Sequence, residues 1–276
     1  MLTFLLHPRV MWNHYFFGTN INSQTFTSRQ TPSDSCVYVS NCLFKFITST
    51  SNGGALSCET VAILLVESTS FFSCSTSGYS GGAIYFSNYG GQCVLREVCG
   101  YDCSTYSTYH FAYLRVASNI MCKNHINYST IARCVNENSG RILYLSYGKI
   151  CCPSVNISKN KGYSRLITIY SNTLISYSTV ADNNATGCTC FILWNRAEFE
   201  FKSCNILRNT QNYLSGEGTF FALGNVMIKD SCIHGNNANC IFYQEDTSKT
   251  ITLSNCTVDR TTNNGYLTIR NTVTKS

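Results

Sequence analysis

The sequence predicts an all-β chain, folded as a single-stranded parallel β-helix of about nine coils that is right-handed by the crossover rule. Three observations support this prediction. A unit of about 27 residues recurs along the chain. Apolar and polar residues alternate with period two inside each unit, which is typical of strands, and no segment shows a sustained helical period. The connecting segments are rich in Gly, Asn and Ser. Units this short cannot bury a core alone, so they must stack.

One small residue anchors the first strand region of each unit. The anchors are Cys42, Thr69, Cys99, Ser129, Val155, Ser178, Cys204, Ser231 and Cys256. Two places later stand Phe44, Phe71, Tyr101, Ile131, Ile157, Val180, Ile206, Ile233 and Val258. All of these are β-branched or aromatic, as strand interiors prefer. Three places before the anchor only Arg96 breaks an apolar column, and five places before it Asn124 and Thr173 do so.

A second strand and a recurring Asn complete the unit. The second strands are expected at residues 55–58, 83–86, 112–116, 142–145, 166–169, 191–194, 220–223, 240–243 and 267–269. In four consecutive units the same turn position holds Asn160, Asn183, Asn209 and Asn236. Stacked side-chain amides can hydrogen-bond to one another, so the sequence predicts an Asn ladder.

The repeat divides the chain into three parts. Residues 1–35 form an N-terminal segment or cap, supplied with aromatic side chains such as Trp12 and Phe26. Residues 36–271 form the parallel β-helix domain, and residues 272–276 are a short C-terminal tail. An open last coil must be covered, so we expect either a fragment or end-to-end self-association through that coil.

Composition excludes several classes of function. Charged residues make up only 12% of the chain, and its net charge of +6 is scattered, so we expect no nucleic-acid groove. No run of 18 apolar residues exists, which predicts no membrane span. The apolar run at the N-terminus is too short for a typical signal peptide.

The chain has 17 Cys and no C-x-x-C motif, so most of these residues are expected to act as small apolar core residues. The close pair Cys188 and Cys190 leaves a metal or redox role open. The anchor cysteines Cys42, Cys99, Cys204 and Cys256 never occupy adjacent coils, so they should not cross-link with one another.

Two segments, Gly53-Gly54-Ala55-Leu56 and Gly81-Gly82-Ala83-Ile84, resemble the GGA-[I/L/V] motif of polymorphic outer-membrane protein repeats. The F-x-x-N motif of those repeats has degenerate counterparts here, such as Ile157-x-x-Asn160. The wider group looks like the pectin-lyase-like superfamily. The resemblance covers residues 36–271, and it implies a surface or secreted protein that is often adhesive. The expected location is therefore extracellular or at the cell surface.

No catalytic cluster is recognisable in the sequence. Asp182, Asp230 and Asp259 lie near anchors at differing offsets, and none of the six Asp forms an Asp-x-Asp. Ser80 stands in a G-x-S-x-G segment, but no helix follows, so we interpret it as a turn residue. The five His are not paired at metal-ligand spacing. The sequence therefore predicts no catalytic, cofactor-binding or metal residues and no cofactor.

The expected function is that of a non-enzymatic β-helix protein with a glycan or protein ligand on an exposed sheet face. Tyr113, Tyr170 and Tyr266 are expected to point outward, where they could bind a ligand or serve only β-propensity. A carbohydrate-active enzyme on the same scaffold and a structural spacer are the alternatives.

Overall fold

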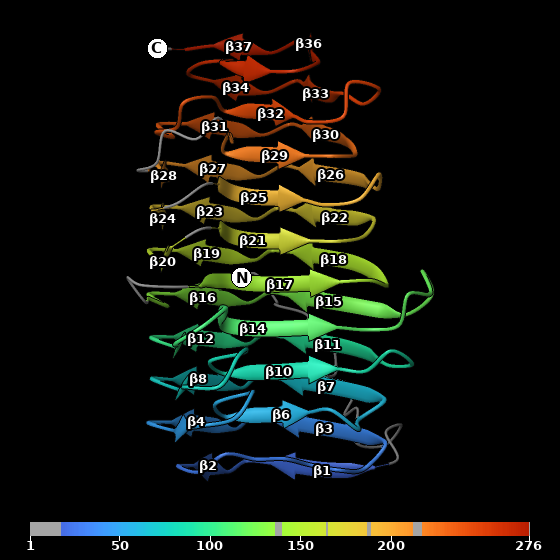
Figure 1. Cartoon of the computed structure of the whole chain (residues 1–276), viewed down its shortest axis with the longest axis vertical. Helices are drawn as coiled ribbons and strands as arrows, with labels where there is room; N and C mark the ends of the chain where they lie inside the picture. The colour runs from blue at the N-terminus through green and yellow to red at the C-terminus, as the bar shows by residue number, and fades with distance from the viewer. Residues whose placement is uncertain (1–17, 136–139, 164, 187–188, 212–216, 276) are drawn as a thin grey trace, which may run out of the picture.

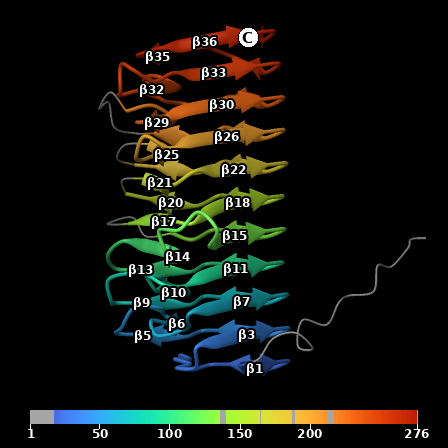
Figure 2. The same ribbon diagram turned by 90° about the vertical axis from the view of Figure 1, so that its right-hand side faces the viewer.

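The computed structural model describes residues 18–135, 140–163, 165–186, 189–211 and 217–275. Within them the chain is all-β, and parallel strands stack coil upon coil into a solenoid, which confirms the predicted fold class. Three long sheets run along the stack, and Figure 1 shows them as successive ladders from the N-terminal to the C-terminal coil. Figure 2, turned by 90°, looks onto the ladder from β1 to β36.

Sheets A and B contain eleven strands each, one pair per coil. Sheet A consists of β1 (Thr19–Asn22), β3 (Cys36–Ser40), β7 (Ile63–Glu67), β11 (Gln92–Arg96), β15 (Lys123–Asn127), β18 (Lys149–Pro153), β22 (Thr173–Ser176), β26 (Glu198–Lys202), β30 (Asn225–Lys229), β33 (Ile251–Ser254) and β36 (Leu267–Arg270). Sheet B consists of β2 (Thr25–Phe26), β4 (Leu43–Lys45), β8 (Ser70–Phe72), β12 (Cys99–Tyr101), β16 (Thr130–Ala132), β19 (Asn156–Ser158), β23 (Thr179–Ala181), β27 (Asn205–Leu207), β31 (Cys232–His234), β34 (Thr257–Val258) and β37 (Val273–Thr274).

Sheet C has nine strands and contains the second strands of the first eight predicted units. The ninth second strand, expected at residues 267–269, belongs to sheet A instead, and the last strand of sheet C lies just before it. It consists of β6 (Leu56–Cys58), β10 (Ile84–Ser87), β14 (Tyr109–Arg115), β17 (Arg141–Ser146), β21 (Arg165–Ile169), β25 (Thr189–Leu193), β29 (Phe220–Ala222), β32 (Phe242–Gln244) and β35 (Asn263–Asn264). Two short sheets lie between B and C: β5 (Thr48–Ser49), β9 (Ser75–Thr76) and β13 (Ser104–Thr105), then β20 (Lys161–Gly162), β24 (Asn184–Ala185) and β28 (Thr210–Gln211).

A single residue with positive φ turns the chain from sheet A to sheet B in every coil. These residues have φ between 45° and 56° and are Ser23, Asn41, Ser68, Glu97, Tyr128, Ser154, Tyr177, Ser203, Asp230, Asn255 and Asn271. Left-handed backbone is unfavourable for residues with a side chain, so the surrounding stack must hold it in place. It does so through hydrogen bonds between coils: the N–H of Ser203 donates to the carbonyl of Lys229 at 3.0 Å. In the nine coils from Asn41 to Asn255, the next residue is the anchor, and its side chain is buried.

The third repeat corrects the predicted register by one residue. Cys99 pairs with Ser70 and Thr130, so the anchor of this coil is the buried Val98, and Cys99 is exposed. The apolar column then continues through the buried Leu95, and Arg96 points outward. A shift of one residue exchanges the two faces of a strand, which is why Arg96 looked like a misfit.

The corrected register places Gly100 where the other coils have a bulky side chain. A Cβ added to Gly100 would lie 2.2 Å from Cε2 of Phe111. The Phe111 ring, from the sheet C strand of the same coil, therefore fills the volume that this position leaves open, and it packs edge-on to Phe71 at 6.3 Å between centroids.

The inward corner after sheet B carries the predicted Asn ladder, which is confirmed. Nδ2 of Asn160 donates to Oδ1 of Asn183 at 3.0 Å, and the pattern continues to Asn209 at 2.9 Å and to Asn236 at 3.0 Å. Each Nδ2 also donates to a sheet B carbonyl of the preceding coil, as Asn183 does to Ile157 at 2.9 Å. All four side chains are buried, so the ladder satisfies polar groups that water cannot reach.

The same column holds cysteines in the preceding coils. Sγ of Cys74 donates to the carbonyl of Phe44 at 3.5 Å, and Sγ of Cys103 donates to that of Phe71 at 3.6 Å. Cys134 joins the two series, because its backbone N–H donates to Oδ1 of Asn160 at 2.9 Å. A thiol and an amide therefore serve the same carbonyl position in different coils.

The two GGA segments mark a close approach between coils. Gly53 and Gly81 both have φ of 71°, a conformation that glycine adopts without strain. A Cβ on Gly54 would lie 2.1 Å from the carbonyl oxygen of Gly82 in the next coil. The second glycine is therefore required because the backbones of adjacent coils pass too close for any side chain.

The stack extends past both predicted limits of the repeat domain. β1 and β2 pair with β3 and β4, so residues before 36 already form a coil, and β37 lies beyond residue 271. Phe26 stacks on Phe44 at 4.8 Å. The other aromatic residues proposed for an N-terminal cap, Trp12 among them, lie outside the described residues.

Candidate functional site

Seven aromatic side chains form a continuous file on the outer face of sheet C, which faces the viewer in Figure 1. We call this set the aromatic file: Tyr85, Tyr113, Tyr144, Tyr170, Trp194, Phe221 and Tyr243. Adjacent ring centroids are 4.5–6.1 Å apart. Six of these side chains are partly exposed, and Phe221 is 8% exposed.

Strand register explains how the file forms and where it shifts. Tyr85, Tyr113 and Tyr144 are direct partners in adjacent strands, so their rings stack in one outward column. The next two positions of that column are Thr168 and Ile192, both fully buried. In those two coils the file continues through the aromatic residues two places further along the chain, Tyr170 and Trp194.

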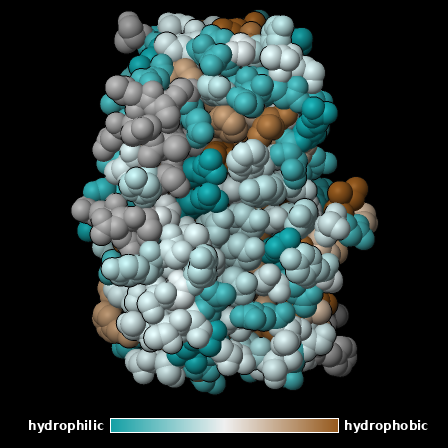
Figure 3. All heavy atoms as spheres, viewed as in Figure 1, coloured by the Kyte–Doolittle hydropathy of each residue, from teal (hydrophilic) through white to brown (hydrophobic). Residues whose placement is uncertain are grey.

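Figure 3 shows this face of the molecule as a surface. Its middle is mostly pale, with intermediate hydropathy, and a hydrophobic patch lies toward the C-terminal coils. More hydrophilic side chains gather along its margins. A flat, partly exposed aromatic surface with polar margins can bind the apolar faces of a ligand and hydrogen-bond its polar edges.

Arginines lie against the aromatic rings. The guanidinium of Arg115 lies 4.3 Å from the ring centroid of Tyr89, and that of Arg165 lies 5.6 Å from that of Trp194. Arg141 donates to the hydroxyl of Tyr109 at 2.8 Å. Three N–H donors of this region have no hydrogen-bond partner among the described residues: Nε of Arg115, Nε of Arg165 and Nε1 of Trp194. All three atoms are buried, so they are unsatisfied polar groups beneath this face and not exposed donors.

Burial keeps the phenols of this face neutral. Desolvation raises the pKa of Tyr109 to about 12 and also raises the pKa values of Tyr85, Tyr113 and Tyr170. These residues therefore present neutral rings and O–H groups at physiological pH.

The sequence identified part of this site. Tyr113 and Tyr170 lie in the aromatic file as expected, whereas Tyr266 is 59% exposed near the last coil and makes no contact with the file. The arginines were missed. Aligning the outward positions of the second strands would have identified Tyr85, Tyr113 and Tyr144 as one column. The shift of the file to Tyr170 and Trp194 depends on tertiary packing and is not visible in that alignment.

The three candidate carboxylates are each bonded within the stack. Asp182 forms two hydrogen bonds with Arg208, at 2.7 and 2.9 Å, and this pairing lowers the pKa of Asp182. Asp230 accepts from Nδ2 of Asn255 at 2.6 Å, and Asp259 accepts from the N–H of Gly235 at 2.7 Å. Each bond joins two adjacent coils, which is a structural use of these side chains.

Ser80 lies in a hydrogen-bonded turn, and Cys190 lies in the core. Oγ of Ser80 lies 2.9 Å from Oγ1 of Thr108 in a turn before sheet C, as expected for a turn residue. Cys190 is buried, and burial raises its thiol pKa, while Cys188 lies outside the described residues. Among the described residues, no three His, Cys, Asp or Glu side chains gather as a metal site would require.

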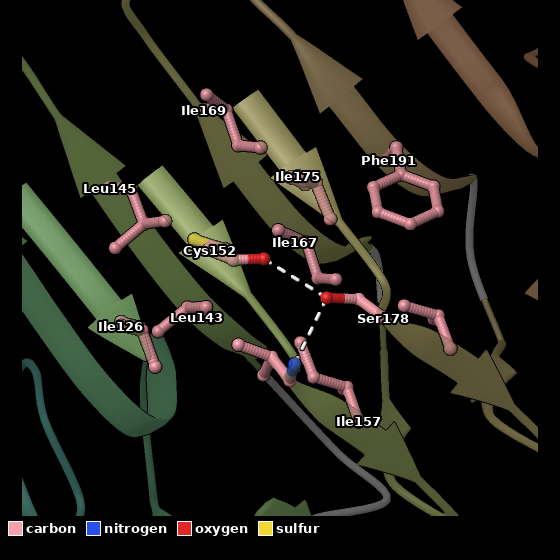
Figure 4. A pocket seen from close by; sticks show the side chains of 12 residues that line it. Ile126, Leu143, Leu145, Cys152, Ile157, Ile167, Ile169, Ile175, Ser178 and Phe191 are labelled. Carbon is pink, nitrogen blue, oxygen red and sulfur yellow. Dashed lines mark hydrogen bonds between the residues drawn. The ribbon is translucent and has the colours of Figure 1, made fainter. Parts of the chain in front are cut away.

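The cavity in Figure 4 belongs to the core. It encloses about 20 Å³ among side chains such as Ile126, Leu145 and Phe191. At its edge Oγ of Ser178 donates to the carbonyl of Cys152 and accepts from the N–H of Val155, both at 3.0 Å. This space holds about one water molecule at most, so it is a packing defect and not a ligand site.

No family model, curated protein or solved structure matches the chain. In the part of the chain that the structure describes, no helix is long and apolar enough to cross a membrane.

Proposed function

We propose that this protein is a non-enzymatic, surface-exposed or secreted β-helix protein that binds a glycan along the aromatic file. The observation that supports this proposal is the stack of partly exposed rings over successive coils, with the guanidinium groups of Arg115 and Arg165 lying beside aromatic rings. Sugar rings pack their C–H faces on aromatic rings and accept hydrogen bonds through their hydroxyl oxygens. A file parallel to the solenoid axis suits an extended oligosaccharide.

The proposed location depends on the GGA motifs. These segments resemble polymorphic outer-membrane protein repeats of the pectin-lyase-like group, and that resemblance favours an adhesive protein at the cell surface or outside the cell. End-to-end self-association is part of the same proposal. β36 and β37 present Ile269 and Val273, which are 48% and 52% exposed, and a second copy could cover them. Sedimentation velocity over a range of concentrations tests this association.

Replacing rings of the file tests the glycan proposal. We expect Tyr113→Ala and Tyr144→Ala each to weaken binding of an oligosaccharide selected on a glycan array by about 1 kcal/mol, since each change removes part of the aromatic edge surface that the stacked rings leave exposed. Isothermal titration calorimetry measures the loss. The matched control is Tyr177→Ala, a 65% exposed tyrosine at the turn between sheets A and B.

Three outcomes would contradict the proposal. Equal losses in the control and the file variants would place the site elsewhere. Absence of binding to any glycan would favour a structural spacer. Depolymerisation of a polyuronate by the purified protein would favour the carbohydrate-active enzyme.

A further inference from the structure

A second surface, on the outer face of sheet A, combines an apolar floor with cationic side chains. We call it the basic groove and define it by Ile63, Leu65, Val94, Arg96, Lys123 and His125. Its volume is about 500 Å³, within the range of small-molecule sites. The strands that form it, β7, β11 and β15, are adjacent in the ladder of Figure 2.

The floor is apolar because outward positions of sheet A hold aliphatic side chains here. Leu65 and Val94 are direct partners in adjacent strands, and Ile63 pairs with Gln92 at the strand start. All three aliphatic side chains are partly exposed. An outward aliphatic surface on a solvent-facing sheet costs free energy unless something covers it.

The carboxylates of this surface are engaged at one end of the groove. Glu67 accepts from the hydroxyl of Tyr38 at 2.7 Å, and Glu97 accepts from that of Ser68 at 2.7 Å. Arg96 lies between them: its Nη1 is 3.3 Å from Oε1 of Glu67, and its Nη2 is 3.5 Å from Oε1 of Glu97. One arginine and two glutamates leave this end with a formal charge of −1.

The other end has an excess of positive charge. Lys123 on β15 and Lys149 on β18 are partners in adjacent strands, and neither forms an ion pair with another described residue. Nε2 of His125 and Nε of Arg96 have no hydrogen-bond partner among the described residues. The positive charges of the two neighbouring lysines attract an anion.

We propose that the basic groove binds a small organic carboxylate whose aryl or alkyl part lies on Ile63, Leu65 and Val94. Its carboxylate would accept hydrogen bonds from Lys123 and His125. Charge complementarity selects an anion, and the apolar floor selects one that carries a hydrophobic group. This site is separate from the aromatic file, so either proposal can fail without the other.

His125 gives the site a pH dependence of known sign. Burial, then Lys123 and Lys149, lower the pKa of His125, so the imidazole is mostly neutral at neutral pH in the free protein. The titratable or charged groups around it are Arg96 on β11, Lys123 on β15, and Lys149 and Cys151 on β18. A bound carboxylate favours the imidazolium, so affinity must increase as the pH falls.

The experiment uses 2-naphthoate as the probe and naphthalene-2-methanol as its neutral analogue, with the whole chain in isothermal titration calorimetry. We expect 2-naphthoate to bind more tightly than the alcohol. Lys123→Gln and His125→Gln should each weaken it about tenfold, the effect of losing one charge-assisted hydrogen bond. The control is Lys202→Gln, an exposed lysine of the same sheet outside the groove. Lowering the pH from 8 to 6 should strengthen naphthoate binding in the unmodified protein but not in the His125→Gln variant.

Equal affinity for the acid and the alcohol, no binding of either, or unchanged binding in both groove variants would overturn the proposal.

Discussion

At the scale of single residues, one inward column shows how this solenoid satisfies buried backbone. Cys74 and Cys103 donate through thiols, and Asn160 to Asn236 donate through amides, to carbonyls at one equivalent position of the preceding coil. The amide also accepts: the backbone N–H of Asn160 donates to Oδ1 of Asn183 at 2.9 Å. An Asn at this column therefore serves two neighbouring coils, whereas a Cys donates to one carbonyl.

This dual role predicts a large cost for removing an interior amide. Asn183→Ala removes the buried hydrogen bonds that this side chain makes with the carbonyl of Ile157 and with the backbone N–H and Nδ2 of Asn160, so we expect a loss of about 2–4 kcal/mol in the free energy of unfolding. Urea unfolding followed by circular dichroism measures it.

The control for this change is Asn205→Ala, an exposed outward position on β27, which should change stability by less than about 0.5 kcal/mol. A loss in Asn183→Ala as small as that of the control would show that the ladder contributes nothing.

At the scale of elements, β12 and β14 exchange volume across the core. β12 has Gly100 at the position where β8 has Phe71 and β16 has Ile131. β14 supplies the missing volume through Phe111, whose ring occupies the site that a Cβ on Gly100 would enter. Glycine inside a strand is accepted here because another element approaches closely.

This exchange predicts coupling between the two positions. Gly100→Val overpacks the site and should destabilise the protein by about 1–3 kcal/mol. In combination with Phe111→Ala, the valine fills part of the space left by the ring, so the double variant should lose at least about 1 kcal/mol less than the two single losses together.

This double-mutant cycle is measured by thermal and urea unfolding of the unmodified protein, the two single variants and the double variant. Gly90→Ala is the control, because the nearest atom to its Cβ is the Asn88 side-chain oxygen at 3.6 Å. Strict additivity of the two core changes would show that Phe111 does not occupy the site of the missing side chain.

At the scale of the whole molecule, the interior contains many protonated thiols. Burial raises the pKa values of Cys58 and Cys152 to about 12, and it raises those of Cys93 and Cys103 well above the ordinary value. The unfolded chain loses its thiol protons near pH 8.5. Above that pH the folded state therefore holds more protons than the unfolded state, and stability must fall as the pH rises.

Thermal unfolding under reducing conditions tests this dependence. Below about pH 8.5, thiol ionisation should leave the midpoint temperature of unfolding unchanged. From there to pH 10, we expect the midpoint temperature to decrease steeply. Cys58→Val should make the decrease shallower, since it removes one buried thiol. A midpoint that stays constant up to pH 10 would show that the thiols ionise equally in the folded and unfolded chain.

The sequence by itself determined the coil, because the information lies in short-range alternation. Period-two patterning placed the inward columns of sheets A and B, and four Asn at one turn position predicted the ladder that joins Asn160 to Asn236. Connecting segments rich in Gly, Asn and Ser predicted the turns between strands. Each of these features is local to a unit and repeats from one unit to the next. The alternation within a single strand is therefore enough to predict which of its side chains point inward.

Tertiary structure decided whatever depends on which side chain of the next coil lies alongside. Because the predicted units differ in length, the anchor of the third coil was misplaced by one residue, and only pairing with β8 and β16 showed Val98 in the interior. Three further features follow from packing in the folded stack. Phe111 fills the space beside Gly100, and the aromatic file shifts to Tyr170 and Trp194. Lys123 lies next to Lys149 in the adjacent strand. Local alternation cannot encode these contacts, since they join residues that are 10 or more positions apart in the chain.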